Sequence, residues 1–136
     1  MQKNDFKFFK NELLKLQRYV NDGSKGYMIF PMVDKYYKEE EACVLNEVFY
    51  DNQKNEFILK TSKKDTEEKP AMSLGLFILM TEISEEKNSK ILIETPDNSE
   101  QFEIKHIYAR ATKDRKNGIL FVKLKTGEEK QIIFNI

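Results

Sequence analysis

Apolar residues in the first part of the chain recur every three or four positions, which is the spacing of one face of an α-helix. Asn4 or Asp5 can cap the start and Asn21-Asp22-Gly23 can end it, so the pattern predicts a helix over about residues 5–21. The stripe either docks on a sheet or pairs with another helix, and its short length favours docking. Five residues form the stripe: Phe6, Phe9, Leu13, Leu16 and Val20.

Beyond residue 25, apolar residues fall mostly in short runs rich in β-branched and aromatic side chains, separated by turn signals. We interpret these runs as strands, with a hairpin loop at residues 51–55 and a charged, mobile loop at residues 62–69. The last third of the chain, residues 101–136, has the pattern of an antiparallel meander. The predicted strands cover residues 26–33, 42–50, 56–61, 90–95, 102–108, 119–125 and 131–136.

Residues 70–87 fit two structures equally well. As a helix, the segment would start near Pro70 and present one apolar face, formed by Met72, Leu76, Leu79, Met80 and Ile83. As a strand, it would alternate apolar and small residues through Met72, Leu74, Leu76, Ile78 and Met80. The helix gives a sheet that carries two helices, whereas the strand gives an eight-strand meander that curls into a partly closed barrel.

The length of 136 residues and the hydrophobic share of 40% support a single domain, residues 1–136, with one core. We expect the helix at about residues 5–21 to be followed by a β-rich body at about residues 26–136. The predicted fold class is α+β, with the N-terminal helix packed on an antiparallel β-meander that can close into a partial barrel.

Charge and cysteine content narrow the classes of function. Lys+Arg 23 and Asp+Glu 23 cancel, which argues against a global nucleic-acid binder and leaves only local electrostatic roles. Cys43 is the only cysteine, so an intrachain disulfide and a cysteine-based metal cluster are excluded, and we expect no cofactor and no metal. The sequence shows no secretory signal, and its longest apolar run, at residues 76–80, is too short to cross a bilayer. We therefore expect a soluble cytoplasmic protein with no membrane partner.

The strongest candidate site is a cluster of cations between residues 105 and 125. Seven basic residues against Asp114 give this stretch a local charge of +6. Alternation places His106, Tyr108 and Arg110 on one face of a strand, and Phe121, Lys123 and Lys125 on one face of the next. If the two faces coincide, cations and aromatic rings interleave on one surface; the competing interpretation is an ordinary sheet face neutralised by neighbouring glutamates. The predicted binding residues are His106, Tyr108, Arg110, Lys113, Arg115, Lys116, Phe121, Lys123 and Lys125.

Two catalytic hypotheses have weaker support in the sequence than the binding face. Pro96-Asp97 followed by Glu103-Ile104-Lys105 resembles the PD-(D/E)xK nuclease pattern, which implies two carboxylates on a divalent cation and a lysine near the attacking water. The resemblance covers only ten residues, and acid-x-Lys triplets recur throughout this chain. Cys43 and His106 could form a thiolate–imidazole pair, although a small buried hydrophobe is the more common use of such a cysteine.

These observations favour binding over catalysis. Our leading hypothesis is a small non-catalytic accessory protein that docks on a protein partner through the basic and aromatic face, of the kind that a phage or mobile element encodes to inhibit a host system. The alternative is a nucleic-acid-binding module that uses the same face, through phosphate contacts and stacking. The third hypothesis is an enzyme, either a small metal-dependent nuclease or one that acts on small molecules.

Overall fold

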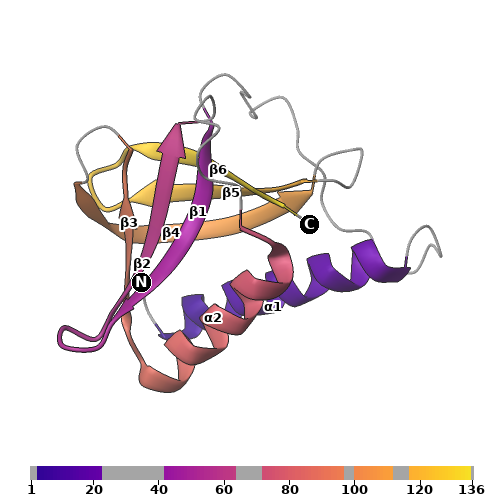
Figure 1. Ribbon diagram of the computed structural model, residues 1–136, viewed down its shortest axis with the longest axis horizontal. Helices are drawn as coiled ribbons and strands as arrows, with labels where there is room; N and C mark the ends of the chain where they lie inside the picture. The colour runs from indigo at the N-terminus through magenta and orange to yellow at the C-terminus, as the bar shows by residue number, and fades with distance from the viewer. Residues whose placement is uncertain (1–2, 23–41, 64–71, 97–99, 112–116, 136) are drawn as a thin grey trace.

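The computed structural model describes residues 3–22, 42–63, 72–96, 100–111 and 117–135 (Figure 1). Within these ranges the chain forms two helices and six strands. In chain order they are α1 (Lys3–Asp22), β1 (Cys43–Asp51), β2 (Glu56–Lys63), α2 (Leu74–Lys87), β3 (Lys90–Glu94), β4 (Gln101–Ala111), β5 (Asn117–Leu124) and β6 (Glu129–Asn135).

The six strands form a closed barrel in the order β1-β2-β3-β4-β5-β6. Strands β1 and β2 form an antiparallel hairpin, and β3, β4, β5 and β6 follow one another in antiparallel pairs. Helix α2 carries the chain from β2 to β3, which is why these two strands are parallel. Strands β1 and β6 close the ring with two parallel residue pairs. Beside them Met72 forms two backbone hydrogen bonds, donating to Leu45 O (2.7 Å) and accepting from Asn135 N (2.8 Å).

The two helices lie together below the barrel in the view of Figure 1. The residues of the α1 stripe whose side chains are described, Phe9, Leu13 and Leu16, are fully buried, so the predicted docking is confirmed. The Phe9 ring lies 5.9 Å from that of Phe77 in α2, and Phe77 lies 5.7 Å from Phe134 in β6, both edge to face. These three rings form one column of core packing that joins α1, α2 and the barrel wall.

Residues 74–87 are helical, so the strand interpretation of this segment was wrong. Ser73 caps the N-terminus of α2 by accepting from Leu76 N at 3.4 Å, and Asn88 ends the helix in the left-handed conformation at φ 52°. Apolar side chains lie on both sides of α2, with Leu74 and Phe77 buried and Leu76 and Leu79 exposed. This two-sided pattern explains why periodicity did not separate the helix from a strand.

The predicted α+β fold is confirmed, with an N-terminal helix packed on a mostly antiparallel sheet. The barrel is complete rather than partial, because β1 and β6 meet. Strand β2 reaches Lys63, so residues 62 and 63 of the loop predicted at residues 62–69 belong to the strand, and residues 64–69 lie outside the described residues. The strand predicted at residues 26–33 lies outside the described residues.

Candidate binding face on β4, β5 and β6

The two predicted faces coincide on the outside of the barrel. His106 of β4 pairs with Lys123 of β5, and Tyr108 pairs with Phe121. Strand β6 continues the same rows, because Glu129 pairs with Lys123 and Gln131 with Phe121. We call this surface the β4–β6 face and define it by the following residues: Lys105, His106, Tyr108, Phe121, Lys123, Glu129 and Gln131.

A β-bulge adds a cation to this face. The register between β4 and β5 shifts between Ile104 and His106, so Lys105 is an extra residue in β4. Ile104 and Ile107 are buried in the barrel, whereas Lys105 and His106 are both exposed. Strict alternation would have turned the residue two positions after Ile104 inward, so the bulge is what brings His106 to the surface.

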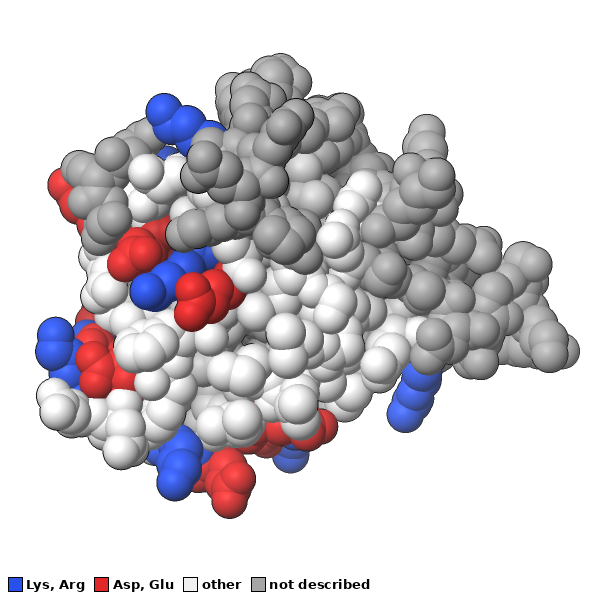
Figure 2. Space-filling model, viewed as in Figure 1, with Lys and Arg blue, Asp and Glu red and all other residues white. Residues whose placement is uncertain are grey.

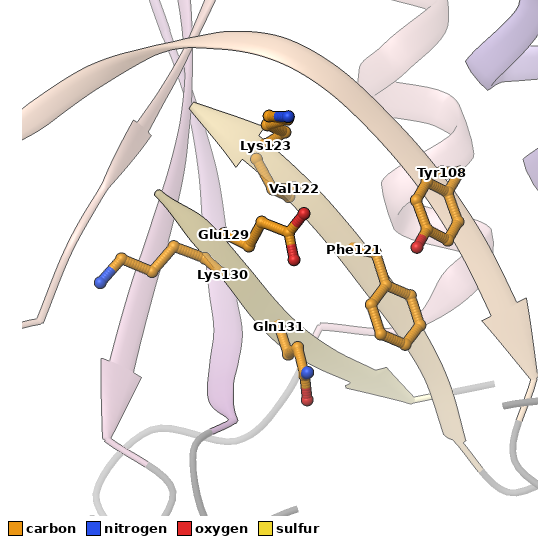
Figure 3. Close-up of a pocket in the computed structure, with 7 residues that line it drawn as sticks. All are labelled: Tyr108, Phe121, Val122, Lys123, Glu129, Lys130 and Gln131. Atoms are coloured by element: carbon orange, nitrogen blue, oxygen red, sulfur yellow. The ribbon is translucent and has the colours of Figure 1, made fainter. Parts of the chain in front are cut away.

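Aromatic rings occupy the centre of the β4–β6 face. The half-buried rings of Tyr108 and Phe121 lie 5.1 Å apart and 12° from parallel, side by side on neighbouring strands (Figure 3). His106 lies 5.8 Å from the Tyr108 ring, and the guanidinium carbon of Arg110 lies 4.5 Å from its centroid. The two rings also line a small, shallow hollow that is open to solvent, with Lys123, Glu129 and Gln131 among its other walls.

The positive charge of the site is smaller than the sequence suggested. Arg110 lies 3.7 Å from a carboxylate oxygen of Glu12, and Lys125 lies 2.5 Å from one of Glu103. Lys105 and Lys123 are exposed and form no ion pair with the residues that the structure describes. Three further predicted cations, Lys113, Arg115 and Lys116, lie outside the described residues.

Glu103 is the centre of an ion-pair network at the end of the site. Its carboxylate contacts Lys125, and it also contacts Lys90 of β3. Hydrogen bonds first from Lys125 and then from Lys90 lower the pKa of Glu103 to about 2. Glu103 is therefore ionised at neutral pH and engaged with two lysines, which is a structural role rather than that of a free metal ligand.

Glu12 is a site residue that the sequence analysis missed. Strand β3 pairs with only Gln101, Phe102 and Glu103 of β4, so the β3 side of the rest of β4 has no strand partner among the described residues. Helix α1 covers that edge, and the Glu12 carboxylate accepts a hydrogen bond from Ala109 N at 2.9 Å. Burial raises the pKa of Glu12, and this effect outweighs the hydrogen bond from Ala109 and the nearby charge of Arg110. The available sequence signal was its position beside the buried stripe, between Phe9 and Leu16.

The described residues bring together neither the metal site nor the Cys43–His106 pair that the sequence analysis considered. Within them no group of three His, Cys, Asp or Glu side chains is placed to hold a metal ion, and Asp97 lies outside the described ranges. Cys43 is on β1 and His106 on β4, two strands that are separated by two others in either direction around the barrel. The thiolate–imidazole pair considered in the sequence analysis is therefore not formed.

Comparison with models of known protein families, with curated proteins and with solved structures found no match to this chain. Neither of the helices in the described part of the chain is long and apolar enough to span a membrane.

Proposed function

We propose that this chain is a small non-catalytic accessory protein that binds a protein partner through the β4–β6 face. The observation that carries the proposal is the half-buried pair of Tyr108 and Phe121, with exposed Lys105, His106 and Lys123 around it. An aromatic centre inside a polar and charged rim is the usual construction of a protein interface, and tyrosine is enriched among the residues that dominate binding energy.

The charges around the aromatic pair favour a protein over a nucleic acid. Arg110 and Lys125 already have carboxylate partners, and Glu129 lies beside Lys123 in the sheet. A phosphate backbone would meet these carboxylates, whereas a protein can place its own acidic and amide groups to match each position. The partner surface that fits carries carboxylates opposite Lys105 and Lys123.

The aromatic rings point to the same class of partner. The Tyr108 ring already contacts the Phe121 ring and the Arg110 guanidinium group. A nucleobase that stacked on Tyr108 would have to displace one of these two neighbours. The hollow at the pair is shallow and open to solvent, so a protein surface can cover the rings and the adjoining Lys123 and Gln131 without entering a deep pocket. An apolar or aromatic side chain of the partner suits this position, and we propose that the protein inhibits its partner by covering this surface.

Site-specific photo-crosslinking tests the proposal. We would place a benzoylphenylalanine at Phe121 and, as a matched control, at Phe49, which is 44% exposed on β1. After irradiation in lysate of the source cell and nuclease digestion, a defined protein adduct at position 121 that is missing at position 49 supports the proposal. A nucleic-acid adduct at position 121 would replace it with the alternative, and equal labelling at both positions, or none, would overturn it.

Binding of the purified partner then measures the contribution of the face. We expect Tyr108→Ala and Phe121→Ala each to weaken the affinity by at least about tenfold, as truncation of a central aromatic residue does. Lys123→Glu should mainly slow association and alter its salt dependence, because it changes a charge at the rim. Unchanged affinity in both alanine variants would show that the partner binds elsewhere.

A further inference from the structure

Helix α2 presents a second apolar surface that the β4–β6 face does not use. Its buried side packs on the core through Leu74 and Phe77, yet Leu76, Leu79 and Ile83 remain 48%, 54% and 37% exposed. Figure 2 shows uncharged surface over α2, with charged side chains gathered near the lower end of the helix. A helix that is apolar on both sides is expected to be covered on both sides, and a contiguous exposed stripe of this kind marks an interaction surface.

The stripe is symmetric along the helix axis. Leu79 lies at its middle and is its most exposed member, while Leu76 and Ile83 lie on either side of it. In an antiparallel pair of α2 helices with a two-fold axis beside Leu79, Leu76 of one copy meets Ile83 of the other, and the two Leu79 side chains meet each other. Every apolar residue of the stripe thus finds an apolar partner in a second copy of the same surface.

Charge also matches in the same arrangement, between Glu82 of one copy and the first turn of α2 in the other. Glu82 lies three positions after Leu79, and Gly75 lies four positions before it. The antiparallel pair therefore places Glu82 over the first turn of the partner helix, where the free backbone N–H groups and the helix dipole favour a negative charge. That first turn has no acidic residue of its own.

Gly75 allows a second α2 helix to approach the backbone of the first closely. A glycine inside a helix costs about 0.5–1 kcal/mol relative to alanine, so its presence calls for a reason. A Cβ at this position would meet nothing within 4 Å in the monomer, so the chain's own packing does not require a glycine there. In the antiparallel pair the missing side chain leaves room for Glu82 of the partner to reach the backbone.

We propose that this protein forms a two-fold symmetric dimer through antiparallel packing of α2 on α2. The occupant of the stripe is a second copy of the chain, because apolar residues, charge and the small residue all match under one two-fold operation. The dimer uses α2 and leaves the β4–β6 face of each copy open. It follows that the assembly carries two copies of that face and can bind a paired or repeated partner with increased avidity.

Sedimentation over a range of protein concentrations tests the dimer. We expect a reversible monomer–dimer equilibrium in the wild type. Leu79→Glu places two carboxylates at the two-fold axis and should weaken dimerisation by at least about tenfold. It should leave Tm unchanged at concentrations at which the wild type is monomeric, because the side chain is 54% exposed in the single chain. Thr126→Glu, an exposed position in the β5–β6 turn, adds the same charge as a control and should leave the equilibrium unchanged. A chain that stays monomeric up to millimolar concentration, or a dimer that Leu79→Glu does not weaken, would overturn the proposal.

Disulfide trapping tests the geometry. In a Cys43→Ala background, Leu79→Cys should form a disulfide-linked dimer rapidly on oxidation, because the two residues meet at the axis. Glu86→Cys lies on the same exposed face, but the two copies of residue 86 would be roughly 21 Å apart along the helices. Faster trapping at residue 79 than at residue 86 supports the antiparallel register, and equal or reversed rates would exclude it.

Discussion

Replacing Glu12 tests how α1 completes the barrel wall. Glu12→Ala removes the acceptor of the Ala109 N–H group and the partner of Arg110. A buried backbone donor left without an acceptor costs about 1–3 kcal/mol. The ion pair adds at most about 1 kcal/mol, because it is long and Arg110 keeps contact with solvent. The two contributions together predict that Glu12→Ala lowers the free energy of unfolding by about 1–4 kcal/mol.

Glu12→Gln separates the hydrogen bond from the charge. Glutamine retains an oxygen that can accept from Ala109 N, and it avoids the cost of burying a carboxylate, so the expected loss of stability is below about 1 kcal/mol. The pKa of Glu12 is raised in the folded protein, so its protonated form favours folding. This contribution is fully present below the unfolded pKa near 4.5 and is lost as the pH rises through the folded pKa, so the wild type should lose stability relative to Glu12→Gln over that range.

Urea unfolding followed by circular dichroism measures these differences, and amide hydrogen exchange at Ala109 reports the hydrogen bond directly. Asn11→Ala, at the neighbouring exposed position of α1, controls for helix propensity. Exchange at Ala109 should accelerate in Glu12→Ala and stay slow in Glu12→Gln. Equal stability and equal exchange in the two variants would refute the reasoning, since they would mean that the Ala109 amide does not depend on this acceptor.

Two further changes test the core and the ion-pair network. Gly118→Ala should destabilise the fold by about 1–3 kcal/mol or more, because the added Cβ would clash with the ring of Phe134, which is fully buried. Phe134→Leu in the same chain should recover part of this loss in a double-mutant cycle. Strictly additive free energies of unfolding would contradict this packing. Glu103→Gln should lower Tm at neutral pH, because the lowered pKa of Glu103 gives stability that is present above about pH 4.5 and is lost as the pH falls through about 2. Thermal melts at several pH values should show the two proteins converging toward pH 2, and a gap that persists there would exclude the ion pairs as its cause.

The local elements could be predicted from the sequence, because each depends on a short repeat. The period of α1 and the β-rich runs from residue 42 onward appear in the structure within a few residues of the prediction. The face shared by Tyr108 and Phe121 could also be predicted in part. Alternation fixes which residues of each strand lie on the same face, and only the register between the two strands was unknown. Helix α2 was not decidable, because its exposed leucines gave it an apolar pattern on both sides.

The long-range contacts could not be predicted from these patterns. Neutralisation of Arg110 comes from Glu12, which lies in a different element almost a hundred residues away. Neutralisation of Lys125 depends on Glu103, and alternation alone could not single out this residue among the neighbouring glutamates. The bulge at Lys105 and the role of Met72 between β1 and β6 follow from how whole strands meet in space.

The short contact between β1 and β6 has a consequence for the kinetics of folding. Neighbouring antiparallel strands are joined by seven or eight residue pairs in β1–β2, β4–β5 and β5–β6, but the ring is closed by only two, between residues from opposite ends of the barrel sequence. Loop-closure entropy delays such distant pairing until the local hairpins exist. The β1–β6 contact should therefore form late and break early, so a transient opening of the native protein would expose the edges of β1 and β6 first.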